Sequence, residues 1–321
     1  MNNALLEQIR LKISQAESIL ITSHVRPDGD AVSSTLAFGI ALQDHGKNIQ
    51  MVLADGVPSA LRFLDGWEQI QKTSQTSPDL IITLDCADRD RIGAAVGEET
   101  QIGINIDHHA TNTQFGRLNL VDAGAVATCS ILADIFPALG LQISTEIAEV
   151  LLAGILTDSQ GFRTLNTNAD SLRIAAVLID SGVNLSALYN RALGRRSLEA
   201  IRYWGIGLSH LQNKNGVVWT SLSIKDRQSV GYQGRDDADL ISVLSSIEGA
   251  RVAIVIIEQD SNTVKVSWRG KAGTDVSQMA ASFGGGGHVA AAGAMVAGSL
   301  QEVEQKVIEA TTIAFENVVI V

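Results

Sequence analysis

Residues 102–109 read Ile102-Gly103-Ile104-Asn105-Ile106-Asp107-His108-His109, an apolar run that ends in an acid and two histidines. Similar short runs rich in Ile, Leu and Val occur at 18–23, 50–54 and 80–84. Such runs are typical of the central strands of a parallel sheet covered on both faces. Segments of helical length alternate with them, at 4–16, 31–43, 126–138 and 145–157. This alternation predicts an α/β fold with a doubly wound, mainly parallel sheet.

A second, smaller unit is predicted beyond this sheet. Residues 186–211 have the pattern of connecting helices, and the polar cluster at 212–216 marks a boundary. Further strands are predicted at 217–223, 252–257 and 263–268, and further helices at 237–247, 275–282 and 299–316. We therefore expect one domain at 1–185, a helical linker at 186–215, and a smaller C-terminal α/β domain at 216–321.

Composition narrows the functional classes. The 321 residues include 24 Lys and Arg against 35 Asp and Glu, a net charge of −11. This balance argues against binding long nucleic acid, which needs a basic surface, but not against short phosphate ligands. The two cysteines, Cys86 and Cys129, favour a reducing cytoplasm over a disulfide scaffold. No run approaches the ~18 apolar residues of a membrane span, and the N-terminus lacks a signal-peptide layout, so we expect a cytoplasmic protein without membrane segments.

Acids and histidines follow the predicted strands. His24, Asp28 and Asp30 come after the first strand, Asp85 closes the run at 80–84, and Asp107, His108 and His109 close the run quoted above. In open α/β sheets ligands bind beyond the carboxyl ends of the strands, so these side chains are expected at one edge. Each has a structural alternative: Asp30 as a helix cap, Asp85 as a loop acid, His108 as a buried imidazole. The clustering favours the functional interpretation.

Asp158 ends the predicted helix at 145–157, where it faces the negative end of the helix dipole. A cation nearby would stabilise it, either Arg163 or a metal ion. Asp28, Asp30, Asp85 and Asp158 together bring four negative charges, which two divalent ions would balance. Carboxylates mixed with imidazoles suit Mn²⁺, with Zn²⁺, Co²⁺ and Fe²⁺ as competitors. Two such ions, about 3.5–4 Å apart, would generate a hydroxide nucleophile and clamp a phosphoryl group.

Five motifs in this order resemble those of a known family. They are His24-x-x-x-Asp28-x-Asp30, Leu84-Asp85-Cys86-Ala87-Asp88, Asp107-His108-His109-x-x-Asn112-x-x-Phe115-Gly116, Gly154-Ile155-Leu156-Thr157-Asp158-Ser159-x-x-Phe162-Arg163 and Gly284-Gly285-Gly286-Gly287-His288. Along nearly its whole length the chain resembles the DHH phosphoesterases. Within that family it looks like the bifunctional oligoribonucleases and 3′-phosphoadenosine 5′-phosphate phosphatases.

The resemblance implies roles for these residues. One metal ion would be held by His24, Asp28 and Asp85, and the other by Asp30, Asp85, His108 and Asp158, with Asp85 as the bridge. Asp107 would orient an imidazole. His109 would lie near the scissile phosphate as a donor or general acid. Arg163 matches a family arginine near the metals, although family members often have Gly-Arg-Phe-Arg where this chain has Gln160-Gly161-Phe162-Arg163.

The second domain resembles the DHH-associated domain, which would bind substrate. Arg269, Gly285, Gly286, Gly287 and His288 are the residues expected to do so. The structural alternative is that the glycine run serves only as a flexible linker. In the functional interpretation its N–H groups stand at a helix start, before an Ala-rich segment, and hold an anion. The resemblance also implies an active site in the cleft between the domains and a homodimer through the first domain.

The first functional hypothesis is a metal-dependent phosphohydrolase that cleaves short oligoribonucleotides, 3′-phosphoadenosine 5′-phosphate, or both. Linear or cyclic dinucleotide phosphodiesterases and the pyrophosphatases or exopolyphosphatases of the same superfamily are alternatives. The glycine–histidine run favours nucleotides over pyrophosphate. A non-catalytic nucleotide sensor is the alternative of another class, and the presence of every expected metal ligand argues against it.

Overall fold

A computed structural model describes residues 3–97, 99–271 and 273–315, with the side chain of His288 outside the described part. The chain separates into two compact units, Met1–Arg195 and Arg196–Val321. The domain limits at 185 and 215 stay a prediction. Within the described residues no single helix is long and apolar enough to cross a membrane. One bent pair, Ala169–Asp180 and Leu185–Gly194, passes on length and composition, a test that core helices of soluble proteins also pass.

The first unit is built on a six-stranded, all-parallel sheet, which confirms the predicted doubly wound fold. Its strands are β1 (Ser18–Thr22), β2 (Asn48–Val52), β3 (Ile70–Gln71), β4 (Leu80–Leu84), β5 (Ile104–Asp107) and β6 (Leu118–Val121). Their order is β3-β2-β1-β4-β5-β6. The chain thus winds outward from β1 to β3, returns to β4 beside β1, and winds outward again. The switch point between β1 and β4 is where such sheets bind ligands.

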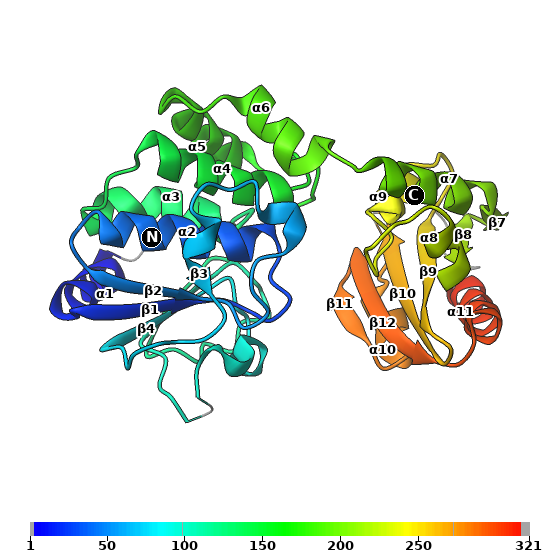
Figure 1. Ribbon diagram of the computed structural model, residues 1–321, viewed down its shortest axis with the longest axis horizontal. Helices are drawn as coiled ribbons and strands as arrows, with labels where there is room; N and C mark the ends of the chain where they lie inside the picture. Colours follow the sequence, from blue (N-terminus) through cyan, green and yellow to red (C-terminus); the bar gives the residue numbers. More distant parts are fainter. Residues whose placement is uncertain (1–2, 98, 272, 316–321) are drawn as a thin grey trace. The chain divides into compact units, whose positions relative to one another are not determined.

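Helices cover this sheet unequally. They are α1 (Asn3–Gln15), α2 (Gly29–Gln43), α3 (Thr128–Leu139), α4 (Thr145–Asp158), α5 (Ala169–Asp180) and α6 (Leu185–Tyr189), with a π-helical turn at Asn190–Gly194 and 3₁₀ segments η1 (Ser59–Leu61), η2 (Trp67–Gln69) and η3 (Arg89–Ala95). Figure 1 shows α2 to α5 gathered on one side of the sheet. Helix α2 is buried from Gly29 to Leu42, since it is apolar on almost every face.

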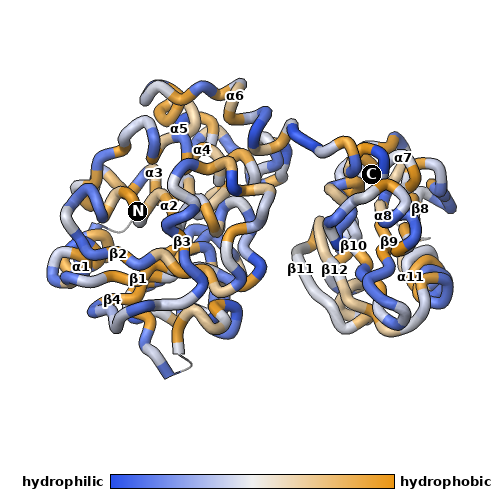
Figure 2. The backbone as a smooth tube through the Cα atoms, viewed as in Figure 1, coloured by the Kyte–Doolittle hydropathy of each residue, from blue (hydrophilic) through white to orange (hydrophobic). Residues whose placement is uncertain are grey.

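Side-chain alternation along β1 divides the core between the two faces of the sheet. Ile19 and Ile21 belong to the large core under the helices. Leu20 points to the other face, where it packs in a smaller core with Ile92 of η3. Figure 2 shows the apolar colouring that runs through these central strands and through α2 and α4. The site-bearing strand ends are therefore held between two cores.

The second unit carries a mixed six-stranded sheet of order β11-β12-β10-β9-β8-β7. Its elements are α7 (Leu198–Ser209), β7 (Gln212–Lys214), β8 (Val217–Leu222), α8 (Ile224–Ser229), α9 (Leu240–Ser245), β9 (Val252–Asp260), β10 (Thr263–Gly270), α10 (Ser277–Ser282), β11 (Gly286–His288), β12 (Ala291–Ala297) and α11 (Leu300–Phe315). Strands β8 and β9 are parallel, and the other neighbours are antiparallel. The smaller C-terminal α/β domain is thereby confirmed.

The structure corrects the prediction that the glycine run begins a helix. Gly286–His288 forms β11, which pairs with the Ala-rich β12 as an antiparallel hairpin. A Cβ on Gly285 would lie 2.1 Å from the carbonyl oxygen of Gly293, and one on Gly287 would lie 2.5 Å from that of Ala291. These glycines allow close strand packing, and this tertiary pairing overrides the helix propensity of the alanines. The edge strands β3, β6 and β7 and the helices α5 and α8 are further elements that the sequence pattern did not predict.

Candidate metal centre

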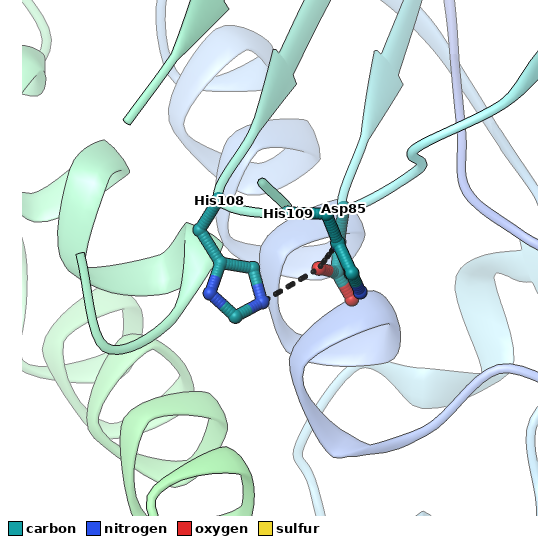
Figure 3. A group of neighbouring side chains, drawn as sticks. All are labelled: Asp85, His108 and His109. Atoms are coloured by element: carbon teal, nitrogen blue, oxygen red, sulfur yellow. Dashed lines mark ion pairs between the residues drawn. The ribbon is translucent and has the colours of Figure 1, made fainter. Parts of the chain in front are cut away.

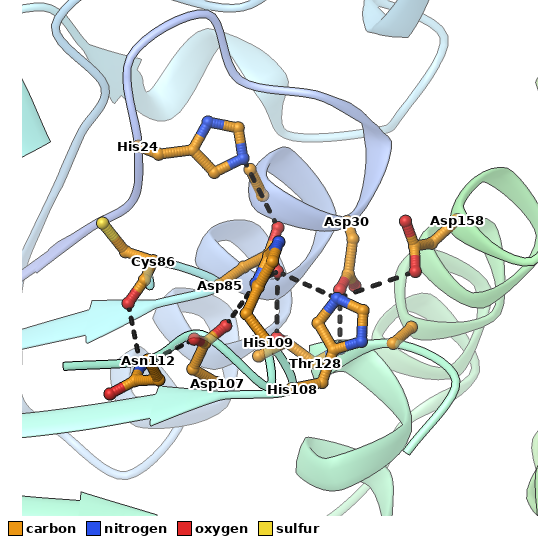
Figure 4. A network of polar contacts seen from close by, with 12 residues as sticks. His24, Asp30, Asp85, Cys86, Asp107, His108, His109, Asn112, Thr128 and Asp158 are labelled. Atoms are coloured by element: carbon orange, nitrogen blue, oxygen red, sulfur yellow. Dashed lines mark hydrogen bonds and ion pairs between the residues drawn. The ribbon is translucent and has the colours of Figure 1, made fainter. Parts of the chain in front are cut away.

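The switch point gathers the first-unit acids and histidines into one cluster (Figure 4). Each of these side chains lies at, or just after, the end of a strand or helix. His24 follows β1, Asp85 follows β4, and His108 follows β5, while Asp158 is the last residue of α4. Donor atoms of three groups lie within 4.8 Å of one another: His24, Asp28 and Asp85; Asp30, His108 and Asp158; and Asp85, His108 and His109.

Two glycines let α2 and α4 approach closely enough to bring Asp30 and Asp158 together. A Cβ on Gly29 would lie 2.1 Å from Oγ1 of Thr157. A Cβ on Gly154 would lie 3.0 Å from Oδ1 of Asp30 and 2.3 Å from the sulfur of Cys129. Any larger residue at either position would therefore push the two helices apart and displace the carboxylates that they carry.

Asp85 faces both sides of the cluster, one oxygen to each. Its Oδ2 lies 3.6 Å from Nε2 of His24, and its Oδ1 lies 3.5 Å from Nε2 of His108. Figure 3 shows the carboxylate with His108 and with His109, whose Nδ1 lies 3.6 Å from Oδ1. Asp85 is 1% exposed, and its backbone is left-handed, with φ of 53°. This strained conformation at the strand end aims the carboxylate into the cluster.

Asp28 is the third donor of the group that contains His24 and Asp85. Its Oδ1 caps α2 by accepting hydrogen bonds of 3.1 Å from the backbone N–H groups of Asp30 and Ala31. Its Oδ2 lies 3.7 Å from Nε2 of His24. The Nδ1 of His24 lies 2.9 Å from the carbonyl oxygen of Val25, an acceptor, so Nδ1 carries a proton and Nε2 is the atom that shares a proton or a cation with the carboxylates.

The second group is Asp30, His108 and Asp158, together with Oδ1 of Asp85. His108 Nδ1 lies 3.3 Å from the carbonyl oxygen of Ala125, while its Nε2 lies 3.7 Å from Oδ2 of Asp158. Within the described residues Asp158 pairs with His108 and not with Arg163. The alternative that Asp30 caps its own helix is wrong, because Asp28 is that cap. Asp30 instead accepts from the first amides of α3.

The cluster is short of positive charge. Burial raises the pKa of Asp30 to about 7 and that of Asp158 to about 8, and neighbouring carboxylates add to both rises. Burial alone would lower the pKa of both imidazoles. The surrounding carboxylates outweigh it and raise the pKa of His24 to about 10 and that of His108 to about 9. Without cations, the cluster is thus stabilised by bound protons.

These donors fit divalent metal ions. Two donor atoms that each lie about 2.1 Å from one ion are separated by about 3.0–3.6 Å. The separations between Asp85 and its two imidazole partners, 3.6 and 3.5 Å, are of this size and exceed those of ordinary hydrogen bonds. Carboxylate oxygens and imidazole nitrogens are ligands of borderline divalent ions. The DHH phosphoesterases are metal-dependent, and the residues present here match that chemistry.

Asp107 and Asn112 support His109 from below the cluster. Asp107 is fully buried at the end of β5, and its Oδ1 accepts a 2.8 Å hydrogen bond from Nδ1 of His109. Its Oδ2 accepts a 2.6 Å bond from the side-chain amide of Asn112, which also donates to Asn105. Asn112 is part of the motif after Asp107, but no local pattern predicted this supporting contact. Buried Cys86, predicted as packing, donates to the carbonyl oxygen of Asp88.

The remaining predicted site residues lie outside this cluster. Arg163 is exposed, just beyond the left-handed residues Gln160 to Phe162 that follow α4. Arg269 lies on β10 in the second unit, opposite Ala291 of β12. Gly285 precedes β11, and Gly286, Gly287 and the backbone of His288 belong to it. A substrate-binding role for these residues stays a prediction, as do the individual roles in the metal cluster.

Comparisons with known proteins agree with this fold. The DHH family, N-terminal domain, matches residues 18–155, and the DHHA1 domain matches residues 228–316. The bifunctional oligoribonuclease and PAP phosphatase NrnA of Thermus thermophilus is 36% identical over 91% of this chain and 88% of the relative. That of Bacillus subtilis is 27% identical over 88% of this chain and 91% of the relative. An exopolyphosphatase-related protein of Bacteroides fragilis has the same fold, with a TM-score of 0.90, 24% identity, and coverage of 98% and 96% of the two chains.

The fold and the site define a phosphoester hydrolase with a metal-binding N-terminal domain and a smaller α/β domain after it. Both family domains occur in order, and the Thermus relative is similar over most of both chains. The chain belongs to the DHH family of phosphoesterases.

Proposed function

We propose that this enzyme hydrolyses phosphate esters of short oligoribonucleotides and of 3′-phosphoadenosine 5′-phosphate. The relatives from Thermus and Bacillus are named for these two activities. The observation that carries the proposal is the carboxylate of Asp85, whose two oxygens face imidazoles of two separate donor groups. This is the arrangement that a bridging ligand of two metal ions requires, and paired ions suit phosphoester hydrolysis.

The contacts support the proposed residue roles. His24, Asp28 and Asp85 would hold one divalent ion, and Asp30, Asp85, His108 and Asp158 would hold the other. Mn²⁺ is the proposed ion, since the donors mix oxygen and imidazole nitrogen. The bound pair would supply Lewis-acid stabilisation of the charge that develops on the phosphoryl oxygens.

His109 is the proposed general acid. Asp107 accepts a hydrogen bond from Nδ1 of its ring, which orients the imidazole. With the ring held in this way, Nε2 would donate a proton to the oxygen of the leaving group. Arg163 is proposed to contact the substrate near the metal ions. Only Ser159 and the three left-handed residues at 160–162 separate it from Asp158.

The second domain is proposed to bind the far phosphate of a short substrate. Arg269 is the cation of this subsite, and Gly285, Gly286, Gly287 and His288 line it. Its support is the hairpin β11–β12, in which β11 is the edge strand of the sheet and Gly286 and Gly287 are exposed. A subsite for one terminal phosphate, combined with a net charge of −11, favours short substrates over long nucleic acid.

A parallel assay tests the proposal. The purified, Mn²⁺-loaded enzyme is given RNA oligomers of two to five nucleotides, 3′-phosphoadenosine 5′-phosphate, linear and cyclic di-adenylate, and pyrophosphate. We expect the RNA oligomers and the bisphosphate to have the highest kcat/KM. A preference for pyrophosphate or for cyclic di-adenylate would overturn the substrate assignment. Absence of turnover on every substrate, with bound metal, would favour a sensor.

We further propose that the enzyme is a cytoplasmic homodimer that assembles through its first domain. Both cysteines are free and buried, as suits a reducing compartment. Apolar side chains stand exposed on α5 and around it, where a second copy would cover them: Leu165, Leu172, Val177, Leu185 and Tyr189.

A further inference from the structure

The start of helix α3 contacts the metal cluster without contributing a predicted ligand. Thr128, the first residue of α3, is fully buried. Its backbone N–H donates to Oδ2 of Asp30 at 2.6 Å, and its hydroxyl donates to Oδ1 of Asp85 at 3.1 Å. Figure 4 shows Thr128 next to these two carboxylates. One residue thereby joins ligands that are 98 and 43 positions away in the sequence.

The neighbouring residues of this segment extend the same support. The N–H of Cys129 donates to Oδ1 of Asp30 at 3.0 Å, so both oxygens of that carboxylate are held by backbone donors. The carbonyl oxygen of Ala125 lies 3.3 Å from Nδ1 of His108, which directs the Nε2 of that ring into the cluster. Ala127, the N-cap of α3, has no capping side chain, so Asp30 satisfies the first amides of the helix in its place.

We propose that Thr128 is a positioning residue for the metal centre, and that 125–129 is the support that orients Asp30, Asp85 and His108. The inference rests on the proposed two-metal function. Thr128 occupies one lone pair of Oδ1 of Asp85 and turns the carboxylate so that its oxygens face different imidazoles. The amides of 128 and 129 supply the positive end of a helix dipole to Asp30, which keeps this buried carboxylate ready to bind a cation. Supporting contacts of this kind set the affinity of metal ligands.

Replacing Thr128 by valine tests this, because Thr128→Val removes the hydroxyl but keeps the shape and the backbone amide. Metal-free protein is titrated with Mn²⁺ by calorimetry, and the EPR spectrum of the bound Mn²⁺ is recorded. We expect two coupled ions in the wild type. In Thr128→Val we expect affinity for at least one ion to fall about 10- to 100-fold, with loss of the coupled signal. Thr128→Ser, which retains the hydroxyl, should restore both.

Ser130→Ala is the matched control. Ser130 lies on the same buried turn, and its hydroxyl donates to the carbonyl oxygen of Ala127 at 2.6 Å rather than to a carboxylate. Wild-type Mn²⁺ affinity and EPR signal in Thr128→Val, or an equal loss in Ser130→Ala, would overturn the proposal. If valine prevents folding, the pair Thr128→Ala and Thr128→Ser makes the same comparison. A wild type that binds no Mn²⁺ would contradict the proposed function instead.

Discussion

At the scale of the residue, Asp85 combines a charge with an unusual backbone. Its left-handed φ of 53° is a conformation that Asp and Asn adopt more readily than other non-glycine residues. Asn is therefore the substitution that removes the charge while preserving the turn. An alanine at this position would change the backbone preference as well, so its effect would mix folding with chemistry.

We expect Asp85→Asn to fold normally and to lose metal-dependent turnover by at least about 100-fold, since a direct ligand matters more than a residue that orients one. The measurements are kcat on 3′-phosphoadenosine 5′-phosphate, Mn²⁺ stoichiometry and circular dichroism. Asp134→Asn makes the same charge change at an exposed position of α3 and should leave turnover intact. Near wild-type activity in Asp85→Asn would eliminate Asp85 as the bridge.

At the scale of the element, the hairpin β11–β12 separates structural from functional glycines. A Cβ at Gly285 would collide with the backbone of Gly293, whereas one at Gly286 would have no neighbour within 4 Å. Packing alone therefore explains Gly285. A methyl group at Gly286 contacts no other protein atom, so any effect of it on substrate binding would have to come from a group outside the hairpin, such as a ligand.

We expect Gly286→Ala to change the free energy of unfolding by less than ~0.5 kcal/mol and to raise KM for nucleotides several-fold, with kcat nearly unchanged. A generic phosphodiester, which lacks the far phosphate, is the control substrate and should be hydrolysed as by the wild type. Gly285→Ala should instead lower the unfolding temperature. Unchanged KM for both substrates in Gly286→Ala would remove this glycine from the phosphate subsite.

The pairing of two aromatic rings in the second unit predicts a dependence of stability on pH. Tyr203 and Tyr232 stack with centroids 5.2 Å apart, and the buried hydroxyl of Tyr203 has no hydrogen-bond partner among the described residues. Burial raises the pKa of both phenols, and for Tyr232 the Asp236 carboxylate adds to the rise. A folded-state pKa above the unfolded value of about 10 gives stability that is complete below pH 10 and is lost above it.

We therefore expect two of the three tyrosines to ionise only as the second unit unfolds in alkali. Phenolate absorbance and circular dichroism are recorded in one titration. The absorbance of these two phenolates should rise over the same pH range in which the circular dichroism of the folded protein is lost. In Tyr232→Phe, only one tyrosine should remain coupled to unfolding. Ionisation of all three rings while the circular dichroism stays native would contradict the expectation.

At the scale of the whole molecule, the proposed dimer face groups five exposed apolar side chains within one stretch of the chain: Leu165, Leu172, Val177, Leu185 and Tyr189. We expect light scattering, recorded as the protein elutes from a size-exclusion column, to give twice the chain mass of 34.0 kDa. Leu172→Glu with Val177→Glu should give the mass of a single chain, because charges on the exposed face of α5 would have to be buried. Ile313→Glu, an exposed apolar site in the second unit, is the control. A single-chain mass for the wild type would contradict the homodimer.

How much the sequence predicts depends on how local the cause is. The strands at 18–22 and 80–84 were identified because a continuous apolar run has a local signature. The short edge strands β3 and β7 have no such run, since they bury little. The Ala-rich segment after the glycine run has a high local helix propensity, and only its pairing with β10 and β11 makes it a strand.

The sequence by itself determined the chemistry of this protein: which acids and histidines stand at the ends of apolar strands, and hence that an α/β sheet gathers metal donors at one edge. The tertiary structure decided how these donors are held. The helix that Asp30 caps, the partner of each oxygen of Asp85, and the contacts of Thr128 depend on the meeting of segments far apart in the chain. These contacts cannot be predicted from local sequence patterns, because they form only when α2, α3 and α4 pack against one another.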